Sequence, residues 1–163
     1  MAQLTANTRA QTGTAPTLVV IARDAGTEGL DARLLDMVGP GSRIVLLAVE
    51  PEPDLVRTRG IMKETVARQL TIAAGMRLEP IRHKMAAAGI ETLEEVRLSD
   101  RPASILDAAK KHGCRTIVVP CRPTTGARRR WVLATGCVGY HIGACLAALS
   151  DIPVIVLPVG ASG

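Results

Sequence analysis

The chain has 163 residues, which is enough for one domain with a sizeable core and too few for two ordinary domains. Its formal net charge is +5, but only Arg128, Arg129 and Arg130 cluster, and aromatic residues make up just 1% of the sequence. Because nucleic acids bind to basic grooves with stacking aromatic side chains, we expect no nucleic-acid partner. The sequence also lacks Walker, HExxH, GxSxG and GxGxxG motifs, so we expect no enzymatic activity.

The first 16 residues, MAQLTANTRAQTGTAP, are polar and lack the apolar segment of a secretory signal. The four cysteines form neither CxxC pairs nor a dense disulfide framework, which is typical of reduced thiols in a cytoplasmic protein. We therefore expect a disordered leader over residues 1–16, one domain over residues 17–160, and a cytoplasmic location.

Runs of β-branched and aliphatic residues predict five strands, at Thr17–Ala22, Arg43–Val49, Thr92–Leu98, Thr116–Val119 and Pro153–Leu157. Helix-length segments lie between them, at Gly29–Met37, Arg57–Ala88, Pro102–His112 and Arg129–Leu149. This alternation indicates crossover connections, and a core without Phe suits a parallel sheet that is covered on both faces. We expect an α/β fold with a doubly wound, five-stranded parallel sheet in the order 3-2-1-4-5 and helices on both faces.

Two of the predicted helices carry internal signals. Pro80 would remove a backbone hydrogen bond from the helix over residues 57–88, so we expect a break near Leu78–Pro80. In the helix that begins at Pro102, Asp100 is available as the N-terminal cap and Gly113 follows the last turn.

The segment VRLSDRPASILDAAKKHGCRTIVVPCRPTTGARRRWVLAT, residues 96–135, resembles the second half of a universal stress protein. TLVVIARDAG resembles the first strand of that family, which ends in an acid, and RIVLLAVE resembles its second strand. The resemblance covers nearly the whole chain after the leader. It implies a doubly wound α/β domain whose dimers commonly pair through the last strand.

Nucleotide-binding members of that family carry Gly, two residues, Gly, nine residues, then Gly followed by Ser or Thr. These positions fall on Cys121, Thr124, Ala134 and Thr135, so only the hydroxyl residue is kept. Glycine allows backbone N–H groups to approach a phosphate closely, and a Cβ hinders that approach. The resemblance therefore implies a degenerate nucleotide loop, and we expect no cofactor.

An adenine-nucleotide sensor is the alternative function. Asp24 occupies the family's position for an acid after the first strand, Arg122 and Thr135 could contact a phosphate, and Gly126 could form a turn. ATP or AMP would then bind through these four residues. The structural alternatives are a turn residue for Asp24 and a helix N-cap for Thr135.

The segment WVLATGCVGYHIGACLAAL, residues 131–149, contains no formally charged residue, so a helix there should be covered on more than one side. Gly139, Gly143 and Ala147 recur every four residues, a spacing that lets another helix, or the domain's own sheet, approach closely. A membrane-associated subunit is a second alternative, because arginines precede the apolar segment and its length approaches that of a membrane span.

Cys137, His141 and Cys145 share one face of that helix but extend over about 12 Å at 1.5 Å per residue. That is too long for one metal ion, so we expect no metal site. Glu94 and Glu95 have no nucleophile beside them in the sequence and are expected to be solvated surface residues.

Together these features predict a non-enzymatic module that forms homodimers and binds a protein partner, or acts as a subunit or regulator of a larger assembly. The last strand is apolar and would need cover at the margin of the sheet. We therefore expect the interface to include Val154 and Val156, together with the small residues Gly139, Gly143 and Ala147.

Overall fold

The computed structural model describes residues 15–23, 27–51, 60–99, 101–121 and 138–160. Five parallel strands form one sheet in the order β3-β2-β1-β4-β5. The strands are β1 (Thr17–Ala22), β2 (Arg43–Val49), β3 (Glu91–Arg97), β4 (Thr116–Cys121) and β5 (Val154–Pro158). The predicted α/β class, parallel pairing and strand order are confirmed.

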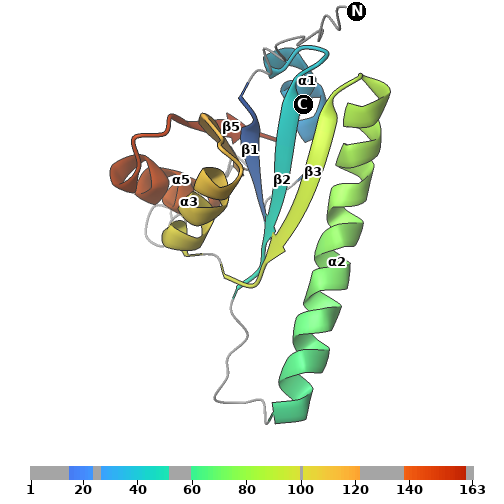
Figure 1. Ribbon diagram of the computed structural model, residues 1–163, viewed down its shortest axis with the longest axis vertical. Coiled ribbons are helices and arrows are strands. Elements are labelled where there is room, and N and C mark those ends of the chain that lie inside the picture. Colours follow the sequence, from blue (N-terminus) through green and yellow to red (C-terminus); the bar gives the residue numbers. More distant parts are fainter. Residues whose placement is uncertain (1–14, 24–26, 52–59, 100, 122–137, 161–163) are drawn as a thin grey trace, which may run out of the picture.

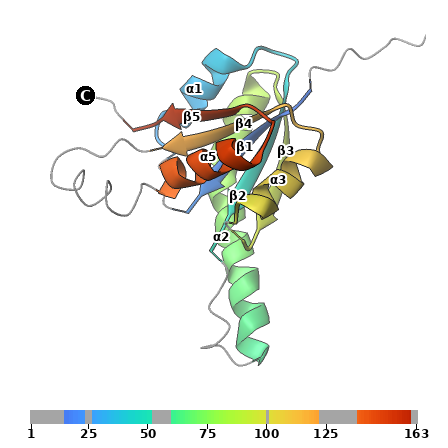
Figure 2. The same ribbon diagram turned by 90° about the vertical axis from the view of Figure 1, so that its left-hand side faces the viewer.

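The described helices are α1 (Leu30–Met37), α2 (Gly60–Ala87), α3 (Pro102–Lys111) and α5 (Val138–Leu149). Helices α1 and α2 cover one face of the sheet, and α3 and α5 cover the other (Figures 1 and 2). The sheet is therefore doubly wound, as predicted. Of the predicted leader, residues 1–14 lie outside the described residues, and the Pro16 carbonyl accepts a hydrogen bond from the Arg115 N–H at 3.2 Å.

Two aliphatic layers form the core, one on each face of the sheet. Val19 and Ile21 of β1 point toward Leu30, Leu34 and the α2 residues Leu78 and Met85. The alternate residues of β1, Leu18 and Val20, pack instead with Ile105, Ala108 and Leu146 of α3 and α5. Because β1 and β2 are buried on both faces, their sequences are continuous aliphatic runs rather than alternating ones.

The predicted break at Pro80 is wrong, because α2 is one continuous helix of 28 residues with Pro80 inside it. Proline removes the N–H that would bond to the Met76 carbonyl. Pro80 is exposed and the Met76 side chain is 68% exposed, so water can replace that lost partner. At α3, Pro102 takes the first turn as expected, but the N-cap residue is Arg101, with no side-chain capping bond, and Asp100 lies outside the described residues.

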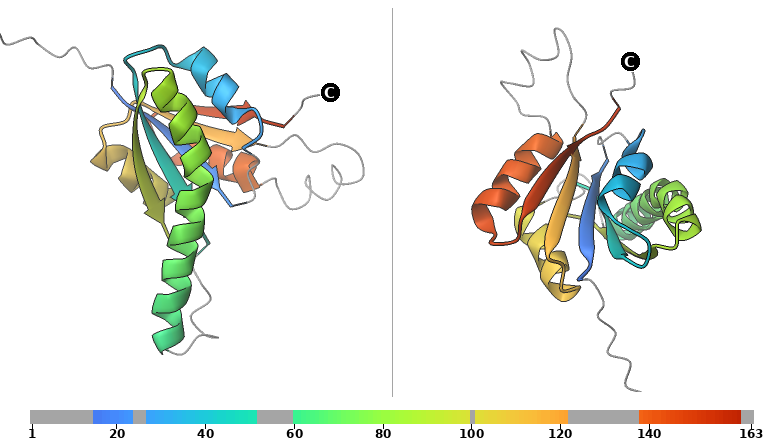
Figure 3. Two further views of the ribbon diagram at one scale, coloured as in Figure 1. Left: turned by 90° about the vertical axis from the view of Figure 1, so that its right-hand side faces the viewer. Right: turned by 90° about the horizontal axis from the view of Figure 1, so that it is seen from above.

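Helix α2 is longer than the sheet it covers. Its 28 residues extend about 42 Å at 1.5 Å per residue, whereas a seven-residue strand such as β2 covers about 23 Å. Figures 1 and 3 show its amino-terminal half projecting past the carboxyl ends of β2 and β3. The described part of the chain therefore leaves most of the surface of this half of α2 uncovered.

Candidate functional site

The nucleotide alternative depends on the carboxyl edge of the sheet, where open α/β folds bind their ligands. Asp24, Arg122, Gly126 and Thr135 all lie outside the described residues, so that prediction stays untested. Of the family loop positions, only Cys121 is described. It is the last residue of β4 and is half-buried.

A buried ion pair occupies the same edge, at the end of β2. Glu50 is 0% exposed, and its N–H donates to the Arg97 carbonyl at 2.9 Å. The Arg77 guanidinium of α2 donates from Nη2 to Glu50 Oε1, while Glu50 Oε2 and Arg77 Nε are buried and have no hydrogen-bond partner among the described residues. The pair links α2 to β2. Removing two charges from water costs free energy, and because the hydrogen bonding of the pair is incomplete, its hydrogen bonds do not fully offset that cost.

A cleft of about 190 Å³ lies between α1 and α2, beside that ion pair. It is lined by Thr27, Glu28, Gly29, Asp31, Arg77, Pro80, Ile81 and Lys84. Lys84 donates to Asp31, and this hydrogen bond holds the pKa of the Asp31 carboxyl below its usual value. Because Arg77 and Lys84 each pair with an acid, the cleft carries no surplus positive charge for an anionic ligand.

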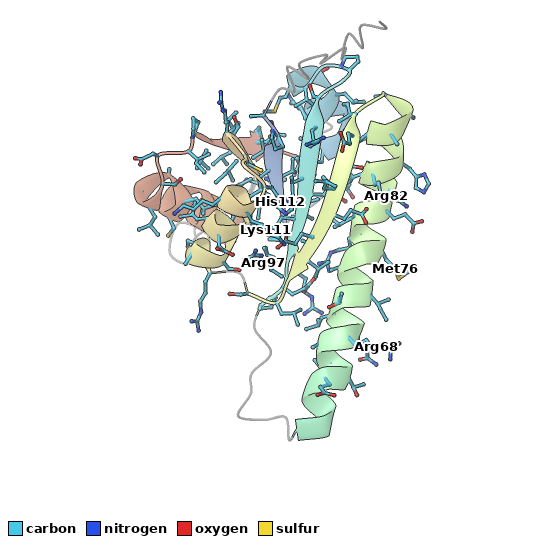
Figure 4. All side chains as sticks on the ribbon, viewed as in Figure 1. Arg68, Met76, Arg82, Arg97, Lys111 and His112 are labelled. Atoms are coloured by element: carbon cyan, nitrogen blue, oxygen red, sulfur yellow. The ribbon has the colours of Figure 1, made fainter. Side chains whose placement is uncertain are left out.

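A second charged cluster joins β3 to α3 on the other face of the sheet. Glu95 accepts from Arg97 Nε at 2.7 Å and from Lys111 Nζ at 3.0 Å, and His112 Nε2 lies 2.6 Å from its second oxygen. Arg97 continues the cluster, donating to Asp107 Oδ2 at 2.8 Å. Figure 4 shows Arg97, Lys111 and His112 close together beside α3.

The expectation that Glu95 is a solvated surface residue is wrong, because its side chain is only 15% exposed. Burial alone would raise the pKa of Glu95, but the hydrogen bonds from His112, Arg97 and Lys111 outweigh it and lower the pKa to about 2. All of these groups are engaged with one another. We therefore interpret the cluster as a structural link that holds α3 against β3, and not as a reactive site.

Strand β5 forms the opposite margin of the described sheet, where β4 is the one described strand that pairs with it. Ile117 N–H donates to the Pro153 carbonyl, and Val159 N–H donates to the Cys121 carbonyl, both at 2.9 Å. In a parallel ladder the residues that bond to the neighbouring strand alternate. Odd-numbered residues of β5 therefore face β4, and the backbone groups of Val154 and Val156 face the open edge.

The side chains at this margin are partly apolar and exposed. Ile155 and Val156 are 38% and 37% exposed, and Leu149, at the end of α5 just before β5, is 65% exposed. Val154 is half-buried beneath the α5 side of the sheet. The predicted interface residues Val154 and Val156 thus lie on the free edge of the sheet.

The three small residues of α5 do not share one environment. Gly143 is buried, and a Cβ placed there would lie 2.8 Å from Val156 Cγ2, so it packs on the domain's own sheet. Ala147 is exposed, and Gly139 lies in the first turn of α5. Of the two roles considered for Gly143, contact with a partner helix or contact with the chain's own sheet, the structure shows the second. Gly143 is therefore not available to a partner.

Neither a metal site nor a membrane span appears in the described part of the chain. No group of three or more His, Cys, Asp or Glu residues there could hold a metal ion. No described helix is long and apolar enough to cross a bilayer. Of the residues considered for metal binding, Cys145 is half-buried on α5, and Cys137 lies outside the described residues.

Three residues of these sites were not predicted from the sequence. Ile155 was not singled out, although it lies between the two predicted edge valines. Glu50 carried a signal, since an acid directly after six buried aliphatic residues is unusual, but its partner Arg77 is 27 positions away. Glu95 was misread because two of its partners, Lys111 and His112, lie at the end of helix α3.

Comparison with known proteins supports the fold. No family model matches the chain, and no curated protein matches it. Among solved structures, hypothetical protein MJ0577 aligns with a TM-score of 0.65 at 15% identity, over 91% of this chain and 98% of that one. Hypothetical protein PH0823 aligns with a TM-score of 0.57 at 13% identity, over 89% and 96% of the two chains.

A universal stress protein family protein from Arabidopsis thaliana, with AMP bound, aligns with a TM-score of 0.50 at 18% identity, over 90% of this chain and 94% of that one. The strand order and the helices on both faces agree with this similarity. The chain therefore has the universal stress protein fold, as the sequence resemblance implied.

Proposed function

We propose that the protein is a non-enzymatic, universal-stress-protein-like module that forms a homodimer through the free edge of β5. In this form it would serve as a protein-binding subunit or regulator of a larger assembly. The observation that carries the proposal is the position of β5 at the margin of the sheet, with exposed apolar side chains and with an outer edge that no other described strand pairs with. Such an edge pairs readily with another strand.

The geometry of β5 favours a particular pairing with a second copy. A two-fold axis at Ile155 would bring two antiparallel β5 strands together. Val154 of one copy would then exchange both backbone hydrogen bonds with Val156 of the other. Pro158 has no N–H, so it would end the ladder at that side. The contact is isologous and closed, which is the usual form of a soluble homodimer.

Side chains add apolar area to this backbone pairing. The two Ile155 side chains would face each other across the axis as a close, non-hydrogen-bonded pair. Leu149 and Ala147, both exposed near the start of β5, could extend the buried area along α5. Burial of these surfaces removes apolar area from water, which is the main favourable term in association.

The test is sedimentation velocity at low micromolar concentration on the wild-type chain and on Ile155→Lys. Two facing lysines should repel at the axis, so the variant should sediment as a monomer where the wild type is a dimer. Leu93→Lys is the matched control, because Leu93 is 40% exposed on β3 at the opposite margin. Unchanged sedimentation of Ile155→Lys, or an equal loss with Leu93→Lys, would count against the β5 interface.

Adenine-nucleotide binding is a second candidate, favoured by the AMP bound to the Arabidopsis protein of the same fold. Protein purified without added nucleotide would be denatured in acid and the extract analysed by liquid chromatography and mass spectrometry. Stoichiometric AMP or ATP would support this function. An empty extract, together with no thermal shift in millimolar AMP or ATP, would argue against it.

A further inference from the structure

The outward face of α2 carries an unexpected apolar pair. The helix packs on the sheet through Ala74, Leu78, Ile81 and Met85, all of which are buried. At 100° per residue, the opposite face of the helix is centred on Ile72 and Met76. These two side chains are 56% and 68% exposed. Figure 4 shows Met76 on the side of α2 that points away from the sheet.

An amphipathic helix on a sheet normally presents polar residues to water. A single exposed apolar residue is common and needs no explanation, but Ile72 and Met76 are neighbours one turn apart. They lie in the middle of a helix that projects past the sheet, and no described element covers this face (Figures 1 and 3). The surface is therefore accessible to another long element.

The apolar pair has a positive residue on its amino-terminal side and a negative residue on its carboxyl-terminal side. Arg68 lies one turn before Ile72, and Glu79 lies about one turn after Met76. Both side chains are exposed, and the helical angle places them on the same flank of the apolar pair. Among the described residues, Glu79 makes two long contacts with basic side chains, at 3.9 Å to Arg82 and 3.6 Å to His83.

We propose that this face of α2 binds the same face of α2 from a second copy, with the two helices antiparallel. A two-fold axis at the level of Ala74 would stack Ile72 of one copy on Met76 of the other. Measured from that axis, Arg68 lies about 9 Å to one side and Glu79 about 8 Å to the other along the helix. Each Arg68 would therefore meet a Glu79 of the other copy, so apolar residues face apolar residues and opposite charges face each other.

This contact is separate from the β5 edge and does not depend on it. It involves only a few residues on each helix, so it should be weaker than a full dimer interface and appear at higher protein concentration. A chain with two different isologous contacts can form closed tetramers or extend into open assemblies. The α2 contact thus supplies a route from a dimer to a larger assembly.

The test is a sedimentation-velocity concentration series on the full chain with Ile155→Lys present throughout, so that the β5 contact is weakened in every sample. We expect this chain to change from monomer to dimer as concentration rises, and we expect Met76→Glu added to it to remain a monomer. Ala103→Glu, which adds the same acid at an exposed position on α3, is the control and should still dimerise.

A charge swap identifies the geometry. Arg68→Glu alone should weaken the association at least several-fold, and Arg68→Glu with Glu79→Arg should restore it. The proposal is overturned if the Ile155→Lys chain stays monomeric at the highest concentration reached, if Met76→Glu leaves the series unchanged, or if the swap associates no better than the single reversal.

Discussion

Gly143 of α5 lies directly against Val156 of β5, so that a Cβ added at Gly143 would stand 2.8 Å from Val156 Cγ2. Such a distance is well inside van der Waals contact, and the branched Val156 side chain has few rotamers with which to avoid it. The absence of a side chain at Gly143 is thus what lets α5 sit on the edge of the sheet. The same contact packs α5 against β5, the strand that we propose forms the dimer.

Gly143→Ala should therefore lower the free energy of unfolding, by about 1–2 kcal/mol after allowing for the better helix propensity of Ala. Gly75→Ala in α2 is the matched control, since a Cβ there meets nothing within 4 Å. It should raise stability by about 0.5–1 kcal/mol. Urea unfolding of both variants measures the difference, and equal effects at the two glycines would contradict the packing described.

Removing Arg77 should leave the Glu50 carboxylate buried without its partner. Arg77→Met is expected to cost about 3–5 kcal/mol, the usual penalty for breaking one side of a buried ion pair. Glu50→Gln with Arg77→Met removes both charges and should lose clearly less than Arg77→Met alone. A urea-unfolding double-mutant cycle measures this coupling, and strictly additive losses would show that the two side chains do not depend on each other.

Stability should fall in acid because of Glu95. Its pKa of about 2 in the folded protein lies below the ordinary 4.5, so its ionised form favours the folded state. That contribution is fully present above about pH 5 and is lost as pH falls toward 2, on the order of 2–3 kcal/mol.

Glu95→Gln should flatten the dependence of unfolding free energy on pH between these limits. Glu91→Gln is the control, because the side chain of Glu91 is 58% exposed and its pair with Arg43 is on the surface. A profile as steep in Glu95→Gln as in the wild type would refute the assignment.

Cys114 should resist alkylation in the native protein. Cys114 is 6% exposed, and burial raises the pKa of its thiol to about 11, so little thiolate forms at pH 8. Peptide mass spectrometry after iodoacetamide treatment should find Cys114 unmodified until urea unfolds the chain. Rapid labelling of Cys114 at zero denaturant would contradict its burial.

The strand bounds were predicted to within two residues, and the largest error is at the inner strand β4, which was predicted to end at Val119 and ends at Cys121. The bounds of β1 and β2 were predicted without error, because strands buried on both faces read as unbroken aliphatic runs. The edge strands β3 and β5 were displaced by one residue, since their exposed positions mix polar and apolar side chains. Pro80 misled the prediction because local propensity does not register the water and packing that let a helix continue through a proline.

The charged contacts could be predicted far less well. Glu50 and Arg77, and likewise Glu95 and His112, are brought together only by the packing of a helix on a strand. Neither pair has a spacing that periodicity could reveal. The position of Val154 and Val156 at the edge of the sheet could be predicted, because the resemblance placed their strand last, at the margin of the sheet.

Amide hydrogen exchange of β5, followed by NMR at several protein concentrations, tests the proposed dimer most directly. Ile155 and Leu157 N–H groups bond to β4 in any state and should be protected throughout, whereas Val154 and Val156 N–H groups face the open edge. We expect the Val154 and Val156 amides to gain protection as concentration rises, and to lose it in Ile155→Lys. Exchange of both valine amides at the rate of an unstructured peptide at every concentration would contradict a dimer formed through β5.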